Sequence, residues 1–251
     1  ITNITVDLNG TSIVNMSAVD LKAMLAALWG HNPYVVNQAS ATNGDVVRVT
    51  IPIPLTRKPY WPKECFPATR RGEFHLSLTL AAEGATFTTR NFSVESVELP
   101  EADPETFLKL VSISRALTAT DFDFPLPVGN DYAGIMIFQP VVLDAGIATG
   151  TIRDVRLLID DAERVVTLSR YESLRADLEM LVKNFDEYTQ GGLAAVFPSL
   201  ASYAYIDFDP LKDGSYLLPT DGRSSVKFRF GLDNAGSPRV IPVELIAVPK
   251  A

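Results

Sequence analysis

Three carboxylates surround a predicted turn in the stretch Asp207-Phe208-Asp209-Pro210-Leu211-Lys212-Asp213-Gly214. Asp207 and Asp209 alternate along a predicted strand and would share one of its faces, with Asp213 on the following loop. Calcium prefers such groups of carboxylate oxygens, but an EF-hand loop would need an oxygen donor where Leu211 stands. The pattern therefore allows a calcium ion at Asp207, Asp209 and Asp213, weighed against the commoner alternative of a solvated strand end.

The other groups that could perform catalysis are few. The chain has two histidines, His31 and His75, and one cysteine, Cys65. His75 takes an outward position on an alternating strand and His31 follows a helix end, so we expect surface or turn positions for both. Cys65 would need a base to act as a nucleophile, and the sequence identifies none. The chain also contains no Gly-x-Ser-x-Gly, Gly-x-Gly-x-x-Gly, Walker or His-Glu-x-x-His motif, so we predict no catalytic residue, no organic cofactor and no enzymatic activity.

Composition narrows the possible classes further. The chain has 251 residues, 47% of them hydrophobic, and a net charge of −8. A surface that binds nucleic acid needs clustered lysine and arginine, so we expect no direct contact with nucleic acid. A single cysteine excludes an intrachain disulfide. Because the chain begins at Ile1 and not at Met, we expect that a segment upstream was removed.

Most of the chain has the two-residue period of half-buried antiparallel strands. Apolar and polar residues alternate over Phe74–Leu80 and Val226–Phe230, and pairs such as Asn43-Gly44, Asp213-Gly214 and Asp221-Gly222 mark turns. The other predicted strands share this composition and cover residues 4–8, 46–53, 87–99, 132–142, 152–159, 203–208 and 240–248.

Two segments have helical periodicity instead. Leu21, Leu25 and Leu28 form one apolar stripe, and Leu174, Leu178, Leu181 and Phe185 form another. A serine with an acidic residue three positions later precedes each stripe (Ser17 and Asp20, Ser169 and Glu172), which predicts a capping box at each helix start. A third, short helix is predicted over residues 104–117.

These elements recur with nearly constant spacing. Ser17 and Ser169 lie 152 positions apart, as do Pro67 and Pro219, and the same shift superimposes residues 74–80 on 226–232. Near the ends, residues 94–100 match 243–249 with a shift of 149. Such self-similarity indicates that one structural unit is used twice. Residues 122–150 have no counterpart in the first copy, which again predicts an upstream segment.

The paired units resemble the double jelly-roll major capsid proteins of tailless icosahedral double-stranded DNA viruses, the lineage of membrane-containing bacteriophages and the adenovirus hexon. The resemblance rests on residues 49–55, Phe66-Pro67 and residues 73–80, with their counterparts 205–211, Leu218-Pro219 and 226–232. It implies an all-β fold with two or three short helices, in which two antiparallel eight-stranded β-sandwiches lie side by side. The first would occupy residues 1–117 and the second residues 118–251.

The resemblance also implies a function and partners. We expect a structural virion protein that forms homotrimers of pseudo-hexagonal outline, packs against neighbouring trimers in an icosahedral shell and assembles in the host cytoplasm. Minor capsid or vertex proteins and an underlying viral membrane are further expected partners. Apolar loop residues are the candidate interface positions: Tyr60, Trp61, Phe66, Tyr216 and Leu217.

Two other functional classes remain open. A carbohydrate-binding or receptor-binding β-sandwich could use Tyr60 and Trp61 as a stacking platform for sugars. A tandem jelly-roll amidase resembling peptide N-glycanase could use acidic residues such as Asp207 and Asp209.

Overall fold

The computed structural model describes residues 1–30, 34–36, 48–82, 90–118, 121–141, 149–164, 168–182 and 200–248. These parts contain two α-helices, α1 (Ala18–Trp29) and α2 (Tyr171–Leu181), and a short 3-10 helix at Leu200–Ser202. The strands are β1 (Asn3–Leu8), β2 (Thr11–Met16), β3 (Tyr34–Val36), β4 (Arg48–Thr50), β5 (Phe74–Thr79), β6 (Thr106–Val111), β7 (Ile113–Ser114), β8 (Asp121–Leu126), β9 (Asp131–Phe138), β10 (Ile152–Ile159), β11 (Ala162–Glu163), β12 (Ser169–Arg170), β13 (Tyr203–Asp207), β14 (Val226–Leu232) and β15 (Arg239–Ala247).

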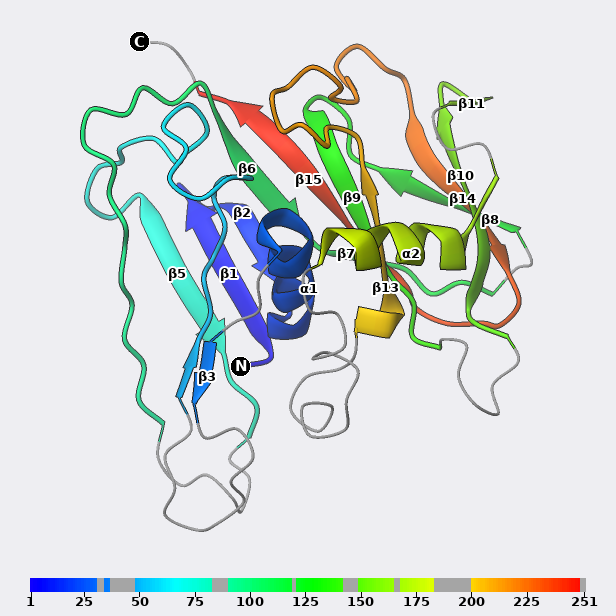
Figure 1. Cartoon of the computed structure of the whole chain (residues 1–251), viewed down its shortest axis with the longest axis horizontal. Helices are drawn as coiled ribbons and strands as arrows, with labels where there is room; N and C mark the ends of the chain where they lie inside the picture. Colours follow the sequence, from blue (N-terminus) through cyan, green and yellow to red (C-terminus); the bar gives the residue numbers. More distant parts are fainter. Residues whose placement is uncertain are drawn as a thin grey trace.

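Two main sheets form the framework. The larger has eight strands in the order β13-β9-β15-β6-β2-β1-β5, with β7 also beside β15 (Figure 1). The smaller has the order β11-β10-β14-β8, with β12 also beside β10. Every pairing in the two sheets is antiparallel except that of β2 with β6. This confirms the predicted β class.

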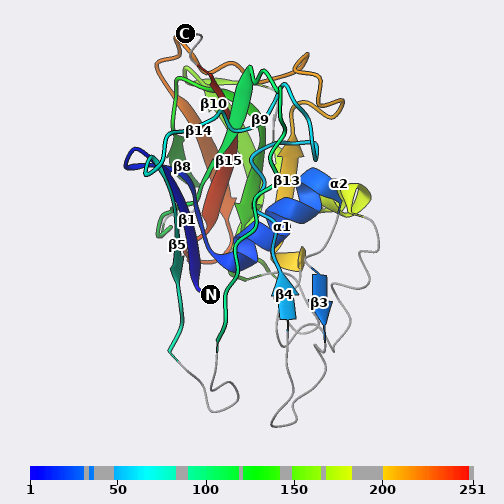
Figure 2. The ribbon, with the colours of Figure 1, turned by 90° about the vertical axis from the view of Figure 1, so that its left-hand side faces the viewer.

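The large sheet belongs to both predicted units, which we call unit one (residues 1–117) and unit two (residues 118–251). It crosses from one to the other where β15 pairs with β6. In unit two the two sheets enclose a core that contains Phe124, Tyr132, Phe228 and Phe230. On the face of the large sheet that α1 covers lies a second apolar core, and both units contribute to it: Leu25 and Leu108 come from unit one, and Met136 and Val243 come from unit two. The two helices lie on the same side of the large sheet (Figures 1 and 2).

The two helices are built differently. Ser17 caps α1 by accepting a hydrogen bond from the Asp20 backbone N–H at 3.1 Å, which is the serine half of the predicted capping box. The acidic half differs, because the Asp20 carboxylate accepts from Tyr203 and Arg239 instead. Nearly every residue of α1 is buried, whereas α2 buries one face only. The predicted cap of α2 is wrong: Ser169 lies in β12, Arg170 takes the N-cap position, and no side chain caps this helix.

The predicted helix over residues 104–117 is also wrong, because this segment forms β6 and β7. Phe107, Leu108 and Leu110 are all buried, since β6 lies inside the large sheet with neighbours on both sides. A strand buried on both faces has a nearly continuous apolar run, which periodicity alone does not separate from a helix.

The strand predictions mostly agree with the structure. Seven segments match β1, β5, β9, β10, β13, β14 and β15. Of the strand predicted over residues 46–53, residues 48–50 form β4, residues 51–53 form no strand, and residues 46 and 47 lie outside the described residues. Of the strand predicted over residues 87–99, residues 90–99 form no strand, and residues 87–89 lie outside the described residues.

The repeat predicted from the sequence appears in the order of the helices and strands. A shift close to 152 residues relates β1 to β10, α1 to α2 and β5 to β14. Fifteen strands in the described residues, several only two or three residues long, fall short of eight regular strands per unit. The boundary at residues 117 and 118 stays a prediction. Neither helix in the described ranges has the length and apolar character needed to span a membrane.

Candidate functional site: the polar junction between the units

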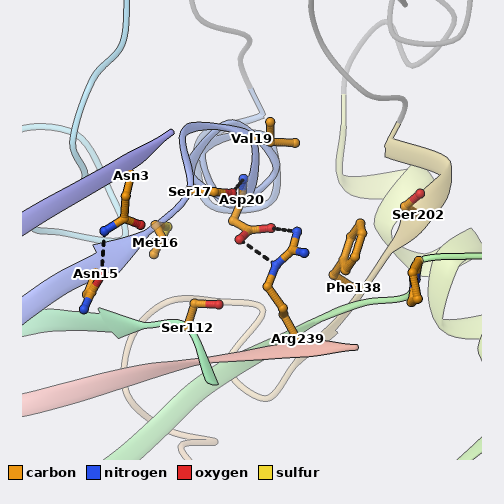
Figure 3. A pocket seen from close by; sticks show the side chains of 11 residues that line it. Asn3, Asn15, Met16, Ser17, Val19, Asp20, Ser112, Phe138, Ser202 and Arg239 are labelled. Carbon is orange, nitrogen blue, oxygen red and sulfur yellow. Dashed lines mark hydrogen bonds and ion pairs between the residues drawn. The ribbon is translucent and has the colours of Figure 1, made fainter. Parts of the chain in front are cut away.

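Unit two holds both ends of α1 through buried polar groups. At the first turn, the fully buried Asp20 carboxylate faces β15 and β13 (Figure 3). Arg239 donates to both of its oxygens, from Nε at 2.9 Å and from Nη2 at 2.6 Å. Tyr203 donates its hydroxyl to Oδ1 at 2.8 Å. A bidentate arginine–carboxylate pair fixes geometry as well as charge, so it sets how α1 sits on the large sheet.

The surroundings keep this cluster in one ionisation state. Burial raises the pKa of Tyr203 well above its ordinary value, and the neighbouring Asp20 charge acts in the same direction. The hydroxyl therefore stays protonated and remains a donor. The Arg239 guanidinium lies 3.7 Å from the centre of the Phe138 ring, in a cation–π contact.

A hollow of about 580 Å³ lies beside this cluster (Figure 3). Unit one contributes Asn3, Asn15 and Ser112 to its lining, and unit two contributes Phe138 and Ser202. Its polar groups already pair with one another: Asn3 donates to Asn15 at 2.9 Å, and Asp20 is held by Arg239. The hollow thus marks the seam between the units.

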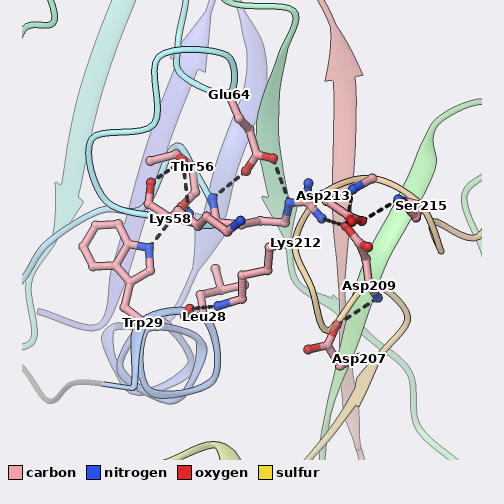
Figure 4. A network of polar contacts seen from close by, with 12 residues as sticks. Leu28, Trp29, Thr56, Lys58, Glu64, Asp207, Asp209, Lys212, Asp213 and Ser215 are labelled. Atoms are coloured by element: carbon pink, nitrogen blue, oxygen red, sulfur yellow. Dashed lines mark hydrogen bonds and ion pairs between the residues drawn. The ribbon is translucent and has the colours of Figure 1, made fainter.

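A second cluster joins two loops near the other end of α1 (Figure 4). Arg57 from unit one donates to Glu64 at 2.7 Å and to Asp209 of unit two at 2.5 Å. All three side chains are almost completely buried. Glu64 also accepts from the Arg57 backbone N–H, and Asp209 accepts from that of Gly214 at 2.8 Å. One oxygen of Asp209, Oδ1, is buried without a hydrogen-bond partner in the described structure.

Burial controls the electrostatics of this second cluster. It raises the pKa of Glu64, although the Arg57 charge and hydrogen bonds oppose the shift. It raises the pKa of Asp207 and lowers that of Lys212. Lys212 donates from Nζ to the carbonyl of Leu28, one of the last carbonyls of α1. A cation there satisfies an otherwise open acceptor and complements the negative end of the helix dipole.

The predicted calcium ligands have other partners. Asp209 pairs with Arg57, Asp207 accepts from the Asp209 backbone N–H at 3.0 Å, and Asp213 accepts from that of Ser215 at 2.9 Å. Across the described ranges, no group of three or more acidic, histidine or cysteine side chains is arranged to hold a metal ion. The structure therefore does not bring these three carboxylates together, and calcium stays a prediction without support from the geometry. The ion pair of Asp209 with Arg57 also disfavours Asp209 as the catalytic carboxylate of the amidase alternative.

The five predicted interface residues separate into two groups. Tyr60 and Tyr216 are 69% and 62% exposed. Phe66 and Leu217 pack against the apolar core around α1, with the ring of Phe66 5.0 Å from that of Phe107. Trp61 is half-buried, and Lys58 Nζ lies 4.6 Å from its ring centre. That cation occupies the aromatic surface that a sugar would need, which disfavours the carbohydrate-binding alternative.

The two candidate catalytic groups in the described structure are at ordinary positions. His75 is exposed and forms a hydrogen bond of 2.7 Å between Nε2 and the Gly72 carbonyl. Burial raises the pKa of the Cys65 thiol, which favours the unreactive protonated form. His31 lies outside the described residues.

Sequence reasoning did not find the residues that form the junction. No motif or periodicity marks Arg57, Arg239 or Lys212, and the sequence pattern presents Asp20 only as part of a capping box. One signal was present: Arg57 and Asp209 are 152 residues apart, the spacing of the repeat, and so occupy equivalent positions in the two units. A second signal is the position of Arg239, a charged residue directly beside an apolar segment.

Comparisons with known proteins identify the architecture. No protein-family model matches the chain, and no curated protein matches its sequence. Among solved structures, the major capsid protein P2 of bacteriophage PM2 is similar over 100% of this chain and 83% of its own, with a TM-score of 0.53 and 12% identity. The PBCV-1 virus capsid model is similar over 98% of this chain and 80% of its own, with a TM-score of 0.57 and 9% identity. The PBCV-1 protein VP54 is similar over 97% and 79%, with a TM-score of 0.56 and 8% identity.

The chain has the double jelly-roll fold. The likeness extends over nearly its whole length, so both units and their arrangement are shared with these proteins. In the double jelly roll of this chain, the Arg57 and Asp20 clusters lie where the two units meet.

Proposed function

We propose that this chain is a structural capsid protein whose copies assemble as trimers into an icosahedral shell. The observation that carries the proposal is the similarity of the whole chain, both units included, to the capsid proteins of PM2 and PBCV-1. A likeness restricted to one unit would fit any single β-sandwich.

The physical features of the chain support the same role. Two β-rich units side by side give each copy two of the six lobes of a pseudo-hexagon, so three copies complete the outline. Such a building block needs a fixed angle between its lobes. The sheet shared by the two units supports a fixed angle, and so do the buried ion pairs of Asp20 with Arg239 and of Arg57 with Asp209. It needs no catalytic group, which favours a structural and non-enzymatic role.

The proposal also assigns surroundings to the protein. The chain would reside in the virion, after assembly in the host cytoplasm, with other copies as its main partners. Minor capsid proteins and a viral membrane are candidate further partners. The exposed Tyr60 and Tyr216 are the side chains we propose for contacts between copies.

The mass of the particle in solution tests the proposal. Native mass spectrometry or light scattering is expected to give three times the chain mass of 27.4 kDa, and electron microscopy of concentrated samples is expected to show pseudo-hexagonal particles. Replacing Tyr60 and Tyr216 by Ala should reduce the trimeric fraction but leave the unfolding midpoint of the isolated monomer unchanged, because both side chains are exposed in the single chain. A chain that stays monomeric at every concentration would contradict the proposal.

A further inference from the structure

A lysine and an asparagine meet at one buried glutamate in the large sheet. Glu244 of β15 is almost completely buried. Lys109 of β6 donates from Nζ to both of its carboxylate oxygens, at 3.0 Å and 3.1 Å. Asn130, the residue directly before β9, donates from Nδ2 to Oε2 at 2.6 Å. The amine of Lys109 and the amide nitrogen of Asn130 thus contact the same carboxylate oxygen.

The order of strands in the sheet brings these three groups together. β15 lies between β6 and β9 (Figure 1). Lys109 is directly opposite Glu244 in the pairing of β6 with β15. On the other side of β15, Glu244 is opposite Tyr132, two residues after Asn130. The register between β15 and β9 shifts next to Glu244, and such a bulge changes the direction of a side chain.

The loop that carries Asn130 is held in place by hydrogen bonds. Gly129 donates its backbone N–H to Oγ1 of the fully buried Thr220 at 2.9 Å. The Thr220 hydroxyl in turn donates to the Asn130 carbonyl oxygen at 2.5 Å. On the other side of the loop, the Tyr132 hydroxyl donates to the Pro127 carbonyl. The amide of Asn130 is therefore positioned in advance beside the amine, and such positioning lowers the barrier of a reaction between two groups.

This arrangement differs from the other lysine ion pairs in the described parts of the chain. Lys63 pairs with Glu105, and both of these side chains are mostly exposed. Lys227 lies between two aspartates on the small sheet. Only the Lys109 pair, among the described residues, includes a carboxamide that donates to the same carboxylate. An ion pair alone does not need that amide, and the amide places an electrophilic carbon next to the amine.

We propose that Lys109 and Asn130 join in an intramolecular isopeptide bond, with Glu244 as the general base and acid of the reaction. Glu244 accepts a proton from Lys109 Nζ, and the neutral amine attacks the amide carbon Cγ of Asn130. The Cγ–Nζ bond forms and the Cγ–Nδ2 bond breaks. The two protons that the lysine gives up pass through Glu244 to the leaving nitrogen, which departs as ammonium. Glu244 ends as the carboxylate it was, and the balance needs no further reactant.

The buried surroundings favour the proton transfer that starts the reaction. Burial raises the pKa of the neighbouring Tyr132, and the charge of Glu244 acts in the same direction. Where water is scarce, a neutral amine and a carboxylic acid are closer in free energy to their ion pair than they are in bulk water. The resulting bond links unit one, through Lys109, to unit two, through Asn130. It goes beyond the proposed capsid role and does not depend on it.

Mass spectrometry of the purified, denatured chain tests the inference. Loss of ammonia is expected to lower the intact mass by about 17 Da. Trypsin does not cleave after an acylated lysine, so it would leave Lys109 in the peptide 91–115 and Asn130 in the peptide 116–153. These two peptides are expected to appear as one linked species. The link also separates this reaction from loss of ammonia within a single asparagine, which joins no peptides.

Variants assign the chemistry to the named groups. Lys109→Arg keeps a cation opposite Glu244 but has no nucleophilic amine, and Glu244→Gln keeps the shape of the side chain but cannot accept the proton. Both are expected to lose the link, and circular dichroism checks that they are folded. Lys63→Arg, in the exposed pair, is the matched control and should keep the link. A native chain of full mass with separate peptides would overturn the inference, whether or not a variant folds. A link formed in full yield by Glu244→Gln would overturn the mechanism.

Discussion

Arg57 holds two buried carboxylates, Glu64 and Asp209, from the two units of the chain. The substitution Arg57→Met would leave both acids buried without their cation. Removing one partner of a buried ion pair costs about 3–5 kcal/mol. We expect a loss of this size in the free energy of unfolding, measured by urea denaturation at neutral pH.

Lys63→Met is the matched control for Arg57→Met. Lys63 is in the same loop and pairs with Glu105, but both of these side chains are mostly exposed. Exposed ion pairs contribute about 0–1 kcal/mol, so this variant should unfold nearly as the native chain does. Equal losses in the two variants would contradict a special role for Arg57.

Asp123 gives the chain a predictable acid sensitivity. Hydrogen bonds from Arg229, followed by those from Lys227, hold its pKa at about 2, below the ordinary value of 3.8. Because the folded pKa is depressed, the stabilisation by Asp123 is present above pH 3.8 and is lost as the pH falls toward 2. We expect the difference in unfolding free energy between the native chain and Asp123→Asn to shrink over this interval. A difference that stays constant from pH 6 to the acid limit would rule out this linkage.

At the scale of elements, the N-termini of α1 and α2 can be compared directly. Ser17 caps α1, whereas Ser169 lies in β12 and caps nothing. Loss of an N-cap side chain costs about 1 kcal/mol. We therefore expect Ser17→Ala to lower the free energy of unfolding by this amount and Ser169→Ala to change it by less than about 0.5 kcal/mol. Similar losses in both variants would mean that the cap contributes nothing of its own.

The same two helices show how much the sequence predicts. Amphipathic periodicity located both α1 and α2, and alternation located the strands that have one buried face. The pattern is misleading at β6, whose apolar run is buried on both faces, and at residues 90–99, whose strand-like sequence has no pairing strand among the described residues. Local pattern reports a preference, and the presence of a pairing strand decides whether that preference is realised.

The candidate site was less predictable than the fold for a physical reason. Arg57 and Asp209 are 152 residues apart, and Asp20 and Arg239 are 219 apart. Each is an ordinary charged residue in its own segment and acquires its role only when the units meet. Apolar loop residues are easier to recognise in the sequence, but two of them, Phe66 and Leu217, pack against the core and are only partly exposed.

At the scale of the whole molecule, the continuous sheet predicts that the two units unfold together. Both tryptophans, Trp29 and Trp61, are in unit one, so their fluorescence reports on that unit alone. The substitution Phe228→Ala creates a cavity in the core of unit two and should cost about 3–5 kcal/mol. We expect it to lower the midpoint of the fluorescence transition and that of the far-ultraviolet circular dichroism transition by the same amount. A fluorescence midpoint that does not move would show that the units unfold independently.

The pairing of β15 with both β9 and β6 has a consequence for the order of synthesis. β15 follows every other strand of the two sheets in sequence, and it is the strand that connects the unit-one strands of the large sheet to those of unit two. A ribosome must therefore translate nearly the whole chain before the large sheet can close. Until then β6 lacks its β15 neighbour, and the two units lack the shared sheet that fixes their relative orientation. A chain that ends before β15 therefore cannot form this junction, whatever the state of its other strands.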